Sequence, residues 1–292
     1  MIVKNPKIIA LIVFITLSAI WSSTWVAIKV GLETVPPFYS AGLRFFIAFL
    51  ILYLFARVKG YKIPKDFHSH LFFIRFGLIN FLVGYASVYW GEQYINSGLT
   101  SVLFAVMPFY TMIFSIWLLP SETITIKRVV GLLIGFSGVV VIFNDQLQFS
   151  SEYAIYGMIA VLISPAFSAM GTLIGKKATK NYHPVILITL PIFYCSITFF
   201  VLSLIFESQS QAIFSNIAIF SIIYLAMFGT AIAFVLYFWM LTRQSAVLMS
   251  MITFVTPPLA LLWGWLILDE QITEYLLLGL VLILIGIFLA RK

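Results

Sequence analysis

The sequence predicts an all-α polytopic membrane protein with ten transmembrane helices, arranged as two inverted five-helix repeats. Of its 292 residues, 62% are hydrophobic and only 9% are charged, whereas an ordinary soluble domain carries about 25% charged residues. The apolar residues form runs of roughly 20, the length at which a helix spans a bilayer. Similar residues recur at matching places in the two halves, which indicates an internal duplication.

Short connections separate the apolar runs, and we interpret each run as one span. Because each half holds an odd number of spans, the second half enters the membrane from the opposite side, as in inverted-topology repeats. We place the first repeat, with spans 1–5, at residues 1–146 and the second, with spans 6–10, at residues 147–292. The predicted spans are residues 8–31, 37–58, 71–92, 98–119, 128–144, 154–176, 184–206, 216–239, 246–268 and 274–290.

Lysine and arginine are distributed unequally between the two sides of the predicted membrane. With the N-terminus in the cytoplasm, the basic residues of the loops and termini fall on the cytoplasmic side. The opposite loops are acidic, and Lys29 at the end of the first span is the basic residue nearest to them. This pattern follows the positive-inside rule. It predicts a protein of the cell (inner or plasma) membrane with both termini in the cytoplasm. The net charge of +7 then reflects orientation and anionic lipid, and no nucleic acid partner is expected.

The internal repeat is based on residue types that rarely match by chance in such a composition. Tryptophan, mid-span proline, glutamate and glycine all recur in the same order in the second half. The matched pairs are Trp90 and Trp239, Pro108 and Pro257, Glu122 and Glu270, Gly131 and Gly279, and Gly138 and Gly286. Small residues let membrane helices approach closely, so we expect the fifth and tenth spans to pack on each other. The two glutamates are interpreted as caps at helix starts.

Three short segments occur together near the start of the chain: Ile-Trp-Ser-Ser-Thr-Trp-Val-Ala-Ile-Lys at residues 20–29, Pro-Pro at 36–37 and Leu-Arg-Phe at 43–45. With the mid-span proline and the glycine-rich fifth and tenth spans, this set resembles the EamA-type proteins of the drug/metabolite transporter superfamily. The resemblance implies ten helices in two inverted halves and the export or exchange of small metabolites. The second half departs from the pattern, so the halves are not chemically equivalent. Arg44 is matched by Pro191, and Trp21 and Trp25 by Ser168 and Thr172.

The first span carries a polar face. Ser18, Ser22, Trp25 and Lys29 share one side of the helix, and such a face avoids lipid in favour of the bundle interior or a water-filled cavity. We therefore assign Ser22, Trp25 and Lys29, together with Trp21, to substrate binding. The alternative is that Lys29 extends its amine to the membrane interface while Trp25 packs.

Arg44 lies inside the second predicted span. An unpaired arginine there costs about 2.5–3.5 kcal/mol on the insertion scale. Its planar guanidinium suits an anion or a carboxylate, so Arg44 is also assigned to substrate binding. Alternatively, it ties helices together through carbonyl groups or through an acid such as Glu33 or Glu92.

Aromatic side chains recur at helical spacing in the third and eighth spans, which correspond in the two halves. Tyr85 and Tyr89 are one turn apart, and Thr230, Phe234 and Tyr237 share one face. A cavity lined by aromatic rings and few charges suits amphipathic solutes and organic cations or zwitterions. These five residues complete the predicted substrate site, and plain packing is the alternative.

Pro108 and Pro257 lie mid-span at equivalent positions. Each proline frees a backbone carbonyl and can kink its helix. We predict that both act as hinges during gating, and static kinks are the alternative.

Motifs for catalysis, metal binding or nucleotide binding are missing from the sequence. We therefore predict a protein that is not an enzyme, with no catalytic residues, no cofactor and no metal. No acidic residue lies deep within a predicted span, which weakens the case for coupling to protons or sodium through a carboxylate. Glu33 and Glu92, at span ends, are the nearest candidates.

Together these features predict a membrane carrier, and the family resemblance implies small organic metabolites, amino-acid-like or amphipathic, as its substrates. It would export them by alternating access through a central cavity between the repeats, as a monomer or weak homodimer in the lipid bilayer. A phosphorylated-sugar or nucleotide-sugar exchanger of the same fold is the first alternative. A non-transporting integral membrane enzyme or scaffold is an alternative from another class.

Overall fold

The structure is a computed structural model that describes residues 6–95, 97–120, 124–143, 153–208, 212–268 and 274–290. Over these ranges every regular element is a helix, in agreement with the predicted all-α class. Glu122 and Glu270, interpreted as caps, lie outside the described residues. The helices are α1 (Pro6–Leu32), α2 (Pro37–Val58), α3 (Phe67–Gly77), η1 (Leu78–Leu82), α4 (Val83–Gly91), α5 (Ser97–Phe104), α6 (Met107–Leu118), α7 (Ile126–Phe143), α8 (Ala154–Ala178), α9 (Pro184–Phe206), α10 (Asn216–Tyr224), η3 (Leu225–Ile232), α11 (Ala233–Leu241), α12 (Ala246–Ser250), α13 (Ile252–Leu268) and α14 (Glu274–Ala290).

Within the described ranges, seven helical stretches are long and apolar enough to cross a membrane. This supports an integral membrane protein. The remaining predicted spans are occupied by α7, by α12 with α13, and by α14, which are not among the seven, so the count of ten spans stays a prediction. The seven are Ile8–Leu32, Pro37–Val58, Phe67–Gly91, Ser97–Leu118, Ala154–Ala178, Pro184–Phe206 and Asn216–Leu241.

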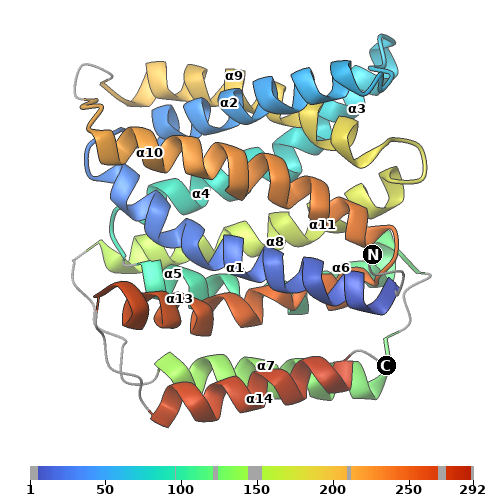
Figure 1. The fold of residues 1–292 in the computed structure, drawn as a ribbon, viewed down its shortest axis with the longest axis vertical. Coiled ribbons are helices and arrows are strands. Elements are labelled where there is room, and N and C mark those ends of the chain that lie inside the picture. The colour runs from blue at the N-terminus through green and yellow to red at the C-terminus, as the bar shows by residue number, and fades with distance from the viewer. Residues whose placement is uncertain are drawn as a thin grey trace.

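Helix α2 begins at Pro37, where a missing backbone N–H costs nothing because the first turn of a helix leaves it unbonded. The carboxylate of Glu207, at the end of α9, accepts hydrogen bonds from the N–H groups of Phe38 (2.6 Å) and Tyr39 (3.0 Å). A negative charge is favourable at a helix N-terminus. The end of α9 therefore caps the start of α2, and the two helices lie antiparallel along one edge of the molecule (Figure 1).

Several spans are interrupted near the middle of the molecule. The third contains the π-helical segment η1 and the eighth contains η3, and wide turns of this kind are frequent at functional sites. Pro108 lies in the first turn of α6, just after the break between α5 and α6. Pro257 instead lies inside α13, several residues after the break at Met251. The two breaks are thus placed differently relative to their prolines, and the hinge role stays a prediction.

Helices α7 and α14 pair at the edge opposite α2 and α9 (Figure 1). A Cβ added to Gly131 would lie 2.6 Å from the carbonyl oxygen of Gly286, and one added to Gly138 would lie 2.6 Å from that of Gly279. The backbones are therefore in contact through glycines, which confirms the predicted packing of the fifth span on the tenth. Gly135 of the same helix lies against Phe254 of α13, which joins the pair to the rest of the molecule.

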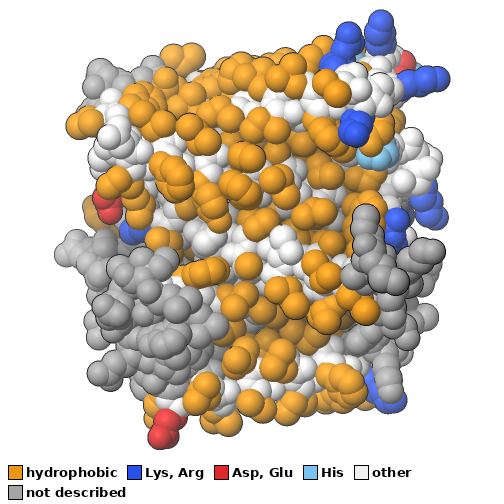
Figure 2. All heavy atoms as spheres, viewed as in Figure 1, with side chains coloured by type: hydrophobic (Ala, Val, Ile, Leu, Met, Phe, Trp, Pro, Cys, Tyr) orange, Lys and Arg blue, Asp and Glu red, His pale blue; other side chains and the backbone are white. Residues whose placement is uncertain are grey.

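The surface in view is covered mainly by hydrophobic side chains between the two ends of the helices (Figure 2). Lysine and arginine gather at the end near both chain termini, on the right, and the acidic side chains in view lie mostly at the opposite end. A broad apolar belt bounded by charged ends is what a bilayer requires of the protein it surrounds.

Candidate functional site

A cavity lies between the two halves of the chain. Its lining comes from α1, α2, η1, α4, α5 and α6 of the first half and from α8, α11, α12 and α13 of the second. It holds about 790 Å³ of space free of protein atoms, including any part open to solvent.

Aromatic rings form one part of the wall. Trp21 of α1 contacts Phe234 and Tyr237 of α11, with ring centroids 5.6 Å and 5.2 Å away. Trp25 contacts Phe104 of α5 at 5.2 Å. These tilted contacts link spans from both halves around the cavity, and together with Tyr85 they give it an aromatic surface.

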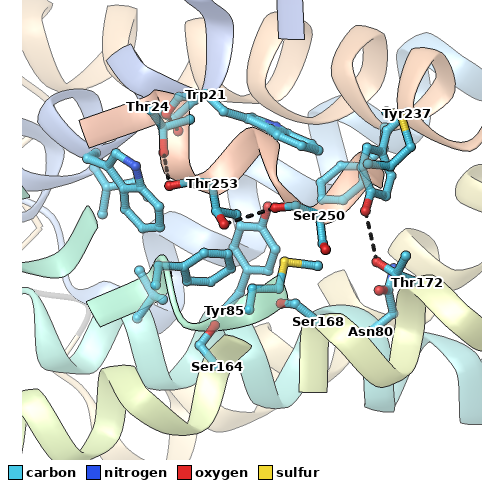
Figure 3. A pocket seen from close by; sticks show the side chains of 18 of the residues that line it. Trp21, Thr24, Asn80, Tyr85, Ser164, Ser168, Thr172, Tyr237, Ser250 and Thr253 are labelled. Atoms are coloured by element: carbon cyan, nitrogen blue, oxygen red, sulfur yellow. Dashed lines mark hydrogen bonds between the residues drawn. The ribbon is translucent and has the colours of Figure 1, made fainter. Parts of the chain in front are cut away.

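Hydroxyl groups form the other part of the wall. Ser164, Ser168 and Thr172 follow one face of α8, across the cavity from Trp21 and Thr24 (Figure 3). The hydroxyls of Thr172 and Tyr237 are 3.2 Å apart. The cavity therefore offers polar contacts on α8 opposite the aromatic rings of α1.

Sequence reasoning missed these hydroxyl residues as site residues. Ser164, Ser168 and Thr172 repeat every four residues, the same signal that identified the polar face of the first span. Ser250 of α12 and Thr253 of α13 also line the cavity. Their spacing crosses the break between the two helices, so a helical pattern did not reveal them.

Arg44 reaches the cavity from α2 although its side chain is only 1% exposed. Its Nε donates to Thr230 Oγ1 (2.8 Å), and its terminal nitrogens donate to Tyr89 Oη and to the carbonyl oxygen of Gly229 (both 3.3 Å). The guanidinium carbon lies 4.8 Å from the ring centroid of Tyr85. Arg44 thus ties α2 to α4 and η3, as the alternative interpretation expected, and it also contributes to the cavity wall.

Two buried side-chain nitrogens of the cavity residues have no hydrogen-bond partner. They are the indole Nε1 of Trp25 and the amide Nδ2 of Asn80. An indole N–H can only donate, and an unsatisfied buried donor costs about 1–3 kcal/mol. Together with Arg44, these groups favour a ligand that carries hydrogen-bond acceptors.

Six of the ten predicted substrate residues line the cavity: Trp21, Trp25, Arg44, Tyr85, Phe234 and Tyr237. Two of the other four, Tyr89 and Thr230, hold Arg44 in place. The third is Ser22, whose hydroxyl accepts a hydrogen bond from Trp263 Nε1 (2.8 Å).

Lys29 is the fourth. It lies at the end of α1 away from the chain termini (Figure 1), and its ammonium donates to the carbonyl oxygens of Glu92 and Ile95. The structure thus places Lys29 outside the cavity lining, on the connection between α4 and α5.

The sequence profile of the EamA-like transporter family matches residues 8–144 and again residues 155–291. The chain belongs to this family. Both halves carry the family's unit, so the duplication inferred from matched proline and glycine residues is supported. The exact boundary between residues 146 and 147 stays a prediction.

Similar proteins of this EamA family are named mainly as transporters without an assigned substrate. The chain is 32% identical to the uncharacterized transporter YoaV of Bacillus subtilis, over 94% of each chain. It is 27% identical to the protein PagO of Salmonella typhimurium, over 97% of this chain and 93% of that one. It is 29% identical to the uncharacterized inner membrane transporter YedA of Escherichia coli, over 90% and 84% of the two chains.

The fold is similar to that of a solved crystal structure, with a TM-score of 0.81 over 96% of each chain and 16% sequence identity. Relatives that are named as transporters support a membrane transporter with a small-molecule substrate and point away from an enzyme.

Proposed function

We propose that this EamA-family chain carries small organic metabolites with an apolar body and a carboxylate or similar acceptor group, amino-acid-like solutes above all. Export by alternating access between the two repeats is the proposed mode. The single observation that carries the proposal is the cavity shared by both halves, in which aromatic rings face hydroxyl groups around one arginine.

The cavity chemistry supports this substrate class. Rings of Trp21, Phe234 and Tyr237 favour an apolar or aromatic body. Arg44 and the unpartnered indole N–H of Trp25 favour an anionic acceptor group, because both can only donate hydrogen bonds. A solute with both parts would give the Trp25 indole N–H the hydrogen-bond acceptor that it otherwise lacks.

Alternating access is supported by the duplicated family unit and by the interrupted helices. The third and eighth spans carry π-helical segments in both halves, and the fourth and ninth carry breaks beside the cavity. Such interruptions are the places where membrane helices change direction most easily. Movement of one repeat against the other about a site near the midplane is the usual mechanism for inverted repeats.

The predicted orientation, with both termini in the cytoplasm of the cell membrane, is part of this proposal. It is supported by the collection of lysine and arginine at the end of the molecule where both termini lie (Figure 2).

A sugar-phosphate or nucleotide-sugar exchanger is less well supported. A phosphate group carries more charge than a carboxylate and usually binds several cations. In the described cavity lining, Arg44 is the one basic residue, because Lys29 donates to backbone carbonyls outside it.

The test is flux in vesicles that contain the purified chain. The panel comprises labelled leucine, phenylalanine, an apolar monocarboxylate, the amide of phenylalanine and a hexose phosphate. We expect flux of the apolar carboxylates and amino acids, and little flux of the hexose phosphate. Absence of flux for every solute would overturn the carrier function, and preferred flux of the hexose phosphate would replace the substrate class.

Trp25→Phe tests the site within the same assay. It removes the indole N–H and keeps an aromatic ring, so KM should rise on the order of tenfold, the equivalent of one lost hydrogen bond. Trp117→Phe is the matched control, because Trp117 of α6 is 69% exposed on the apolar surface. Equal KM values for the two variants would exclude Trp25 from the site.

A further inference from the structure

Glu92 is a buried carboxyl group that the proposed transport site does not use. It follows Gly91 at the C-terminal end of α4, where its backbone N–H donates to the carbonyl of Val88 (2.8 Å). Its side chain is 0% exposed, and neither carboxyl oxygen has a hydrogen-bond partner of normal geometry. Glu92 lies at a span end, as the sequence predicted, and it is one of the two acids named there as the nearest candidates for a coupling carboxylate.

Three side chains from three other helices act on this carboxyl. They are Lys29 of α1, Thr100 of α5 and Arg44 of α2. Tyr89, one turn earlier on α4, accepts a hydrogen bond from the Arg44 guanidinium over 3.3 Å. Helix α8 also packs on this end of α4, and there it presents the backbone of Gly157 against Gly91.

Burial disfavours the ionised form of a carboxyl, and nearby cations favour it. Here the two influences oppose each other, because the carboxyl is fully buried while the Lys29 and Arg44 charges act on it. The Lys29 ammonium, however, donates to two backbone carbonyl oxygens, those of Glu92 and of Ile95 (3.0 Å for Ile95). It does not donate to the Glu92 side-chain carboxyl. The carboxyl is therefore left without the direct ion pair that would hold it ionised.

The end of α1 is bonded to the connection that carries Glu92. Lys29 lies in the last turn of α1 and bonds the connection between α4 and α5 at residues 92 and 95. If α1 moves away from that connection as the carrier opens at this end, Glu92 becomes hydrated. A group that is buried in one state and hydrated in another binds protons with different affinity in the two states, and proton binding then shifts the balance between them.

We propose that the Glu92 carboxyl is a proton-binding site whose occupancy is linked to the packing of the end of α1 on the α4–α5 connection. The inference deepens the proposed transport function and rests on it for the role of the movement. The proton is the ligand, Glu92 binds it, and Lys29 sets how tightly it is held.

The direction of the linkage follows from burial. The closed packing favours the neutral carboxyl, so protonation stabilises the closed state at this end. As pH rises and the proton is lost, the buried carboxylate becomes costly and the open, hydrated state is favoured. The Lys29 charge favours the ionised form of the Glu92 carboxyl. In Lys29→Gln the Glu92 carboxyl should therefore stay protonated to higher pH than in the parent protein.

Infrared spectroscopy tests the proton site without any transport. Exposed carboxyls are ionised above about pH 6. A carbonyl stretch of a protonated carboxylic acid that is still present above this pH therefore reports a buried acid. We expect this band in the parent protein, its absence in Glu92→Gln and its presence in Glu92→Asp. Glu33→Gln is the matched control, because Glu33 is an exposed acid directly after α1, and it should keep the band.

A parent protein without the band, or a Glu92→Gln variant that keeps it, would overturn the proton site. Loss of the band at lower pH in Lys29→Gln would overturn the role given to Lys29. Glu92→Asp guards against a variant that fails to fold, because it restores a titrating carboxyl at the same position.

Vesicle flux tests the linkage to movement. We expect flux to vary with pH in the parent protein and in Glu33→Gln, over the range in which the infrared band is lost, and to be independent of pH in Glu92→Gln. The same pH profile in Glu92→Gln and the parent would overturn the linkage. If no solute moves in the parent, the proposed function fails, and the infrared result still decides whether Glu92 binds a proton.

Discussion

Replacing Arg44 by lysine keeps the buried positive charge and removes the guanidinium fork. The guanidinium makes three hydrogen bonds, at 2.8 Å to Thr230 and at 3.3 Å to Tyr89 and to the carbonyl of Gly229. A lysine ammonium is a point charge on a flexible stem and cannot hold this planar set together. Arg44→Lys therefore separates the effect of charge from the effect of geometry.

The magnitude follows from those contacts. Hydrogen bonds to charged groups contribute about 1.5–3 kcal/mol each. The two bonds at 3.3 Å are at the weak end of that range, and lysine can keep one partner. We expect the free energy of unfolding to fall by about 2–3 kcal/mol. If Arg44 binds a substrate carboxylate through both terminal nitrogens, that contact is lost as well, and KM for such substrates should rise about tenfold to a hundredfold.

The assay compares phenylalanine with its amide in vesicles. If Arg44 binds the carboxylate, Arg44→Lys raises KM for phenylalanine and leaves that for the amide nearly unchanged. Thermal unfolding in detergent measures the structural part of the effect separately. Arg75→Lys is the matched control, because Arg75 is an exposed arginine of α3 that lies outside the cavity lining.

One result refutes the reasoning on substrate binding. If stability falls while the ratio of the two KM values stays at that of the parent, Arg44 only ties α2 to η3 and α4. If stability also stays unchanged, the three hydrogen bonds contribute little and the structural reasoning is wrong as well.

Three further predictions concern packing and helix capping. Gly131→Ala should lower the free energy of unfolding by about 1–3 kcal/mol, because the alanine Cβ would lie 2.6 Å from the carbonyl oxygen of Gly286. An unchanged melting temperature would show that α7 and α14 separate easily. Glu207→Gln should lower the free energy of unfolding by about 0.5–1 kcal/mol at low salt, because it removes a negative charge from the start of α2. The control Glu33→Gln should leave stability unchanged. The same loss in both variants would argue against a specific cap by Glu207. Partial burial holds the pKa of His183, which caps α9 through Nδ1, below its ordinary value, so this cap should stabilise the protein above about pH 6.5 and be lost as pH falls through the lowered pKa. The melting temperature should fall less at low pH in His183→Asn than in the parent protein. An equal fall in the two proteins would contradict the cap.

The sequence predicted the helices well because a span requires little more than an apolar run of sufficient length. Helices α2 and α9 begin at the predicted residues 37 and 184, where proline fixes the first turn. The glycine contacts between α7 and α14 were also predictable, since close approach needs a residue without a side chain. The π-helical segments η1 and η3 were not predicted, because their composition is that of any apolar helix.

The site was predicted in part. Trp21, Trp25 and Arg44 were predicted because a polar helix face or a charged side chain within a span is unfavourable in contact with lipid. All three line the cavity. Tyr89 and Thr230 were placed in the substrate site from helical spacing alone. Spacing gives the face of a helix but not the partner opposite it, and here that partner is the Arg44 side chain.

By itself the sequence determined the all-helical class, the duplication and the unequal distribution of charge along the chain. These follow from hydrophobicity and from local residue patterns. The tertiary structure alone decided which polar residues meet: Ser164, Ser168 and Thr172 lie across from Trp21, and Glu92 is buried where Lys29 bonds its backbone carbonyl. Burial and electrostatic environment are properties of the packed helices, and residues distant in sequence create them.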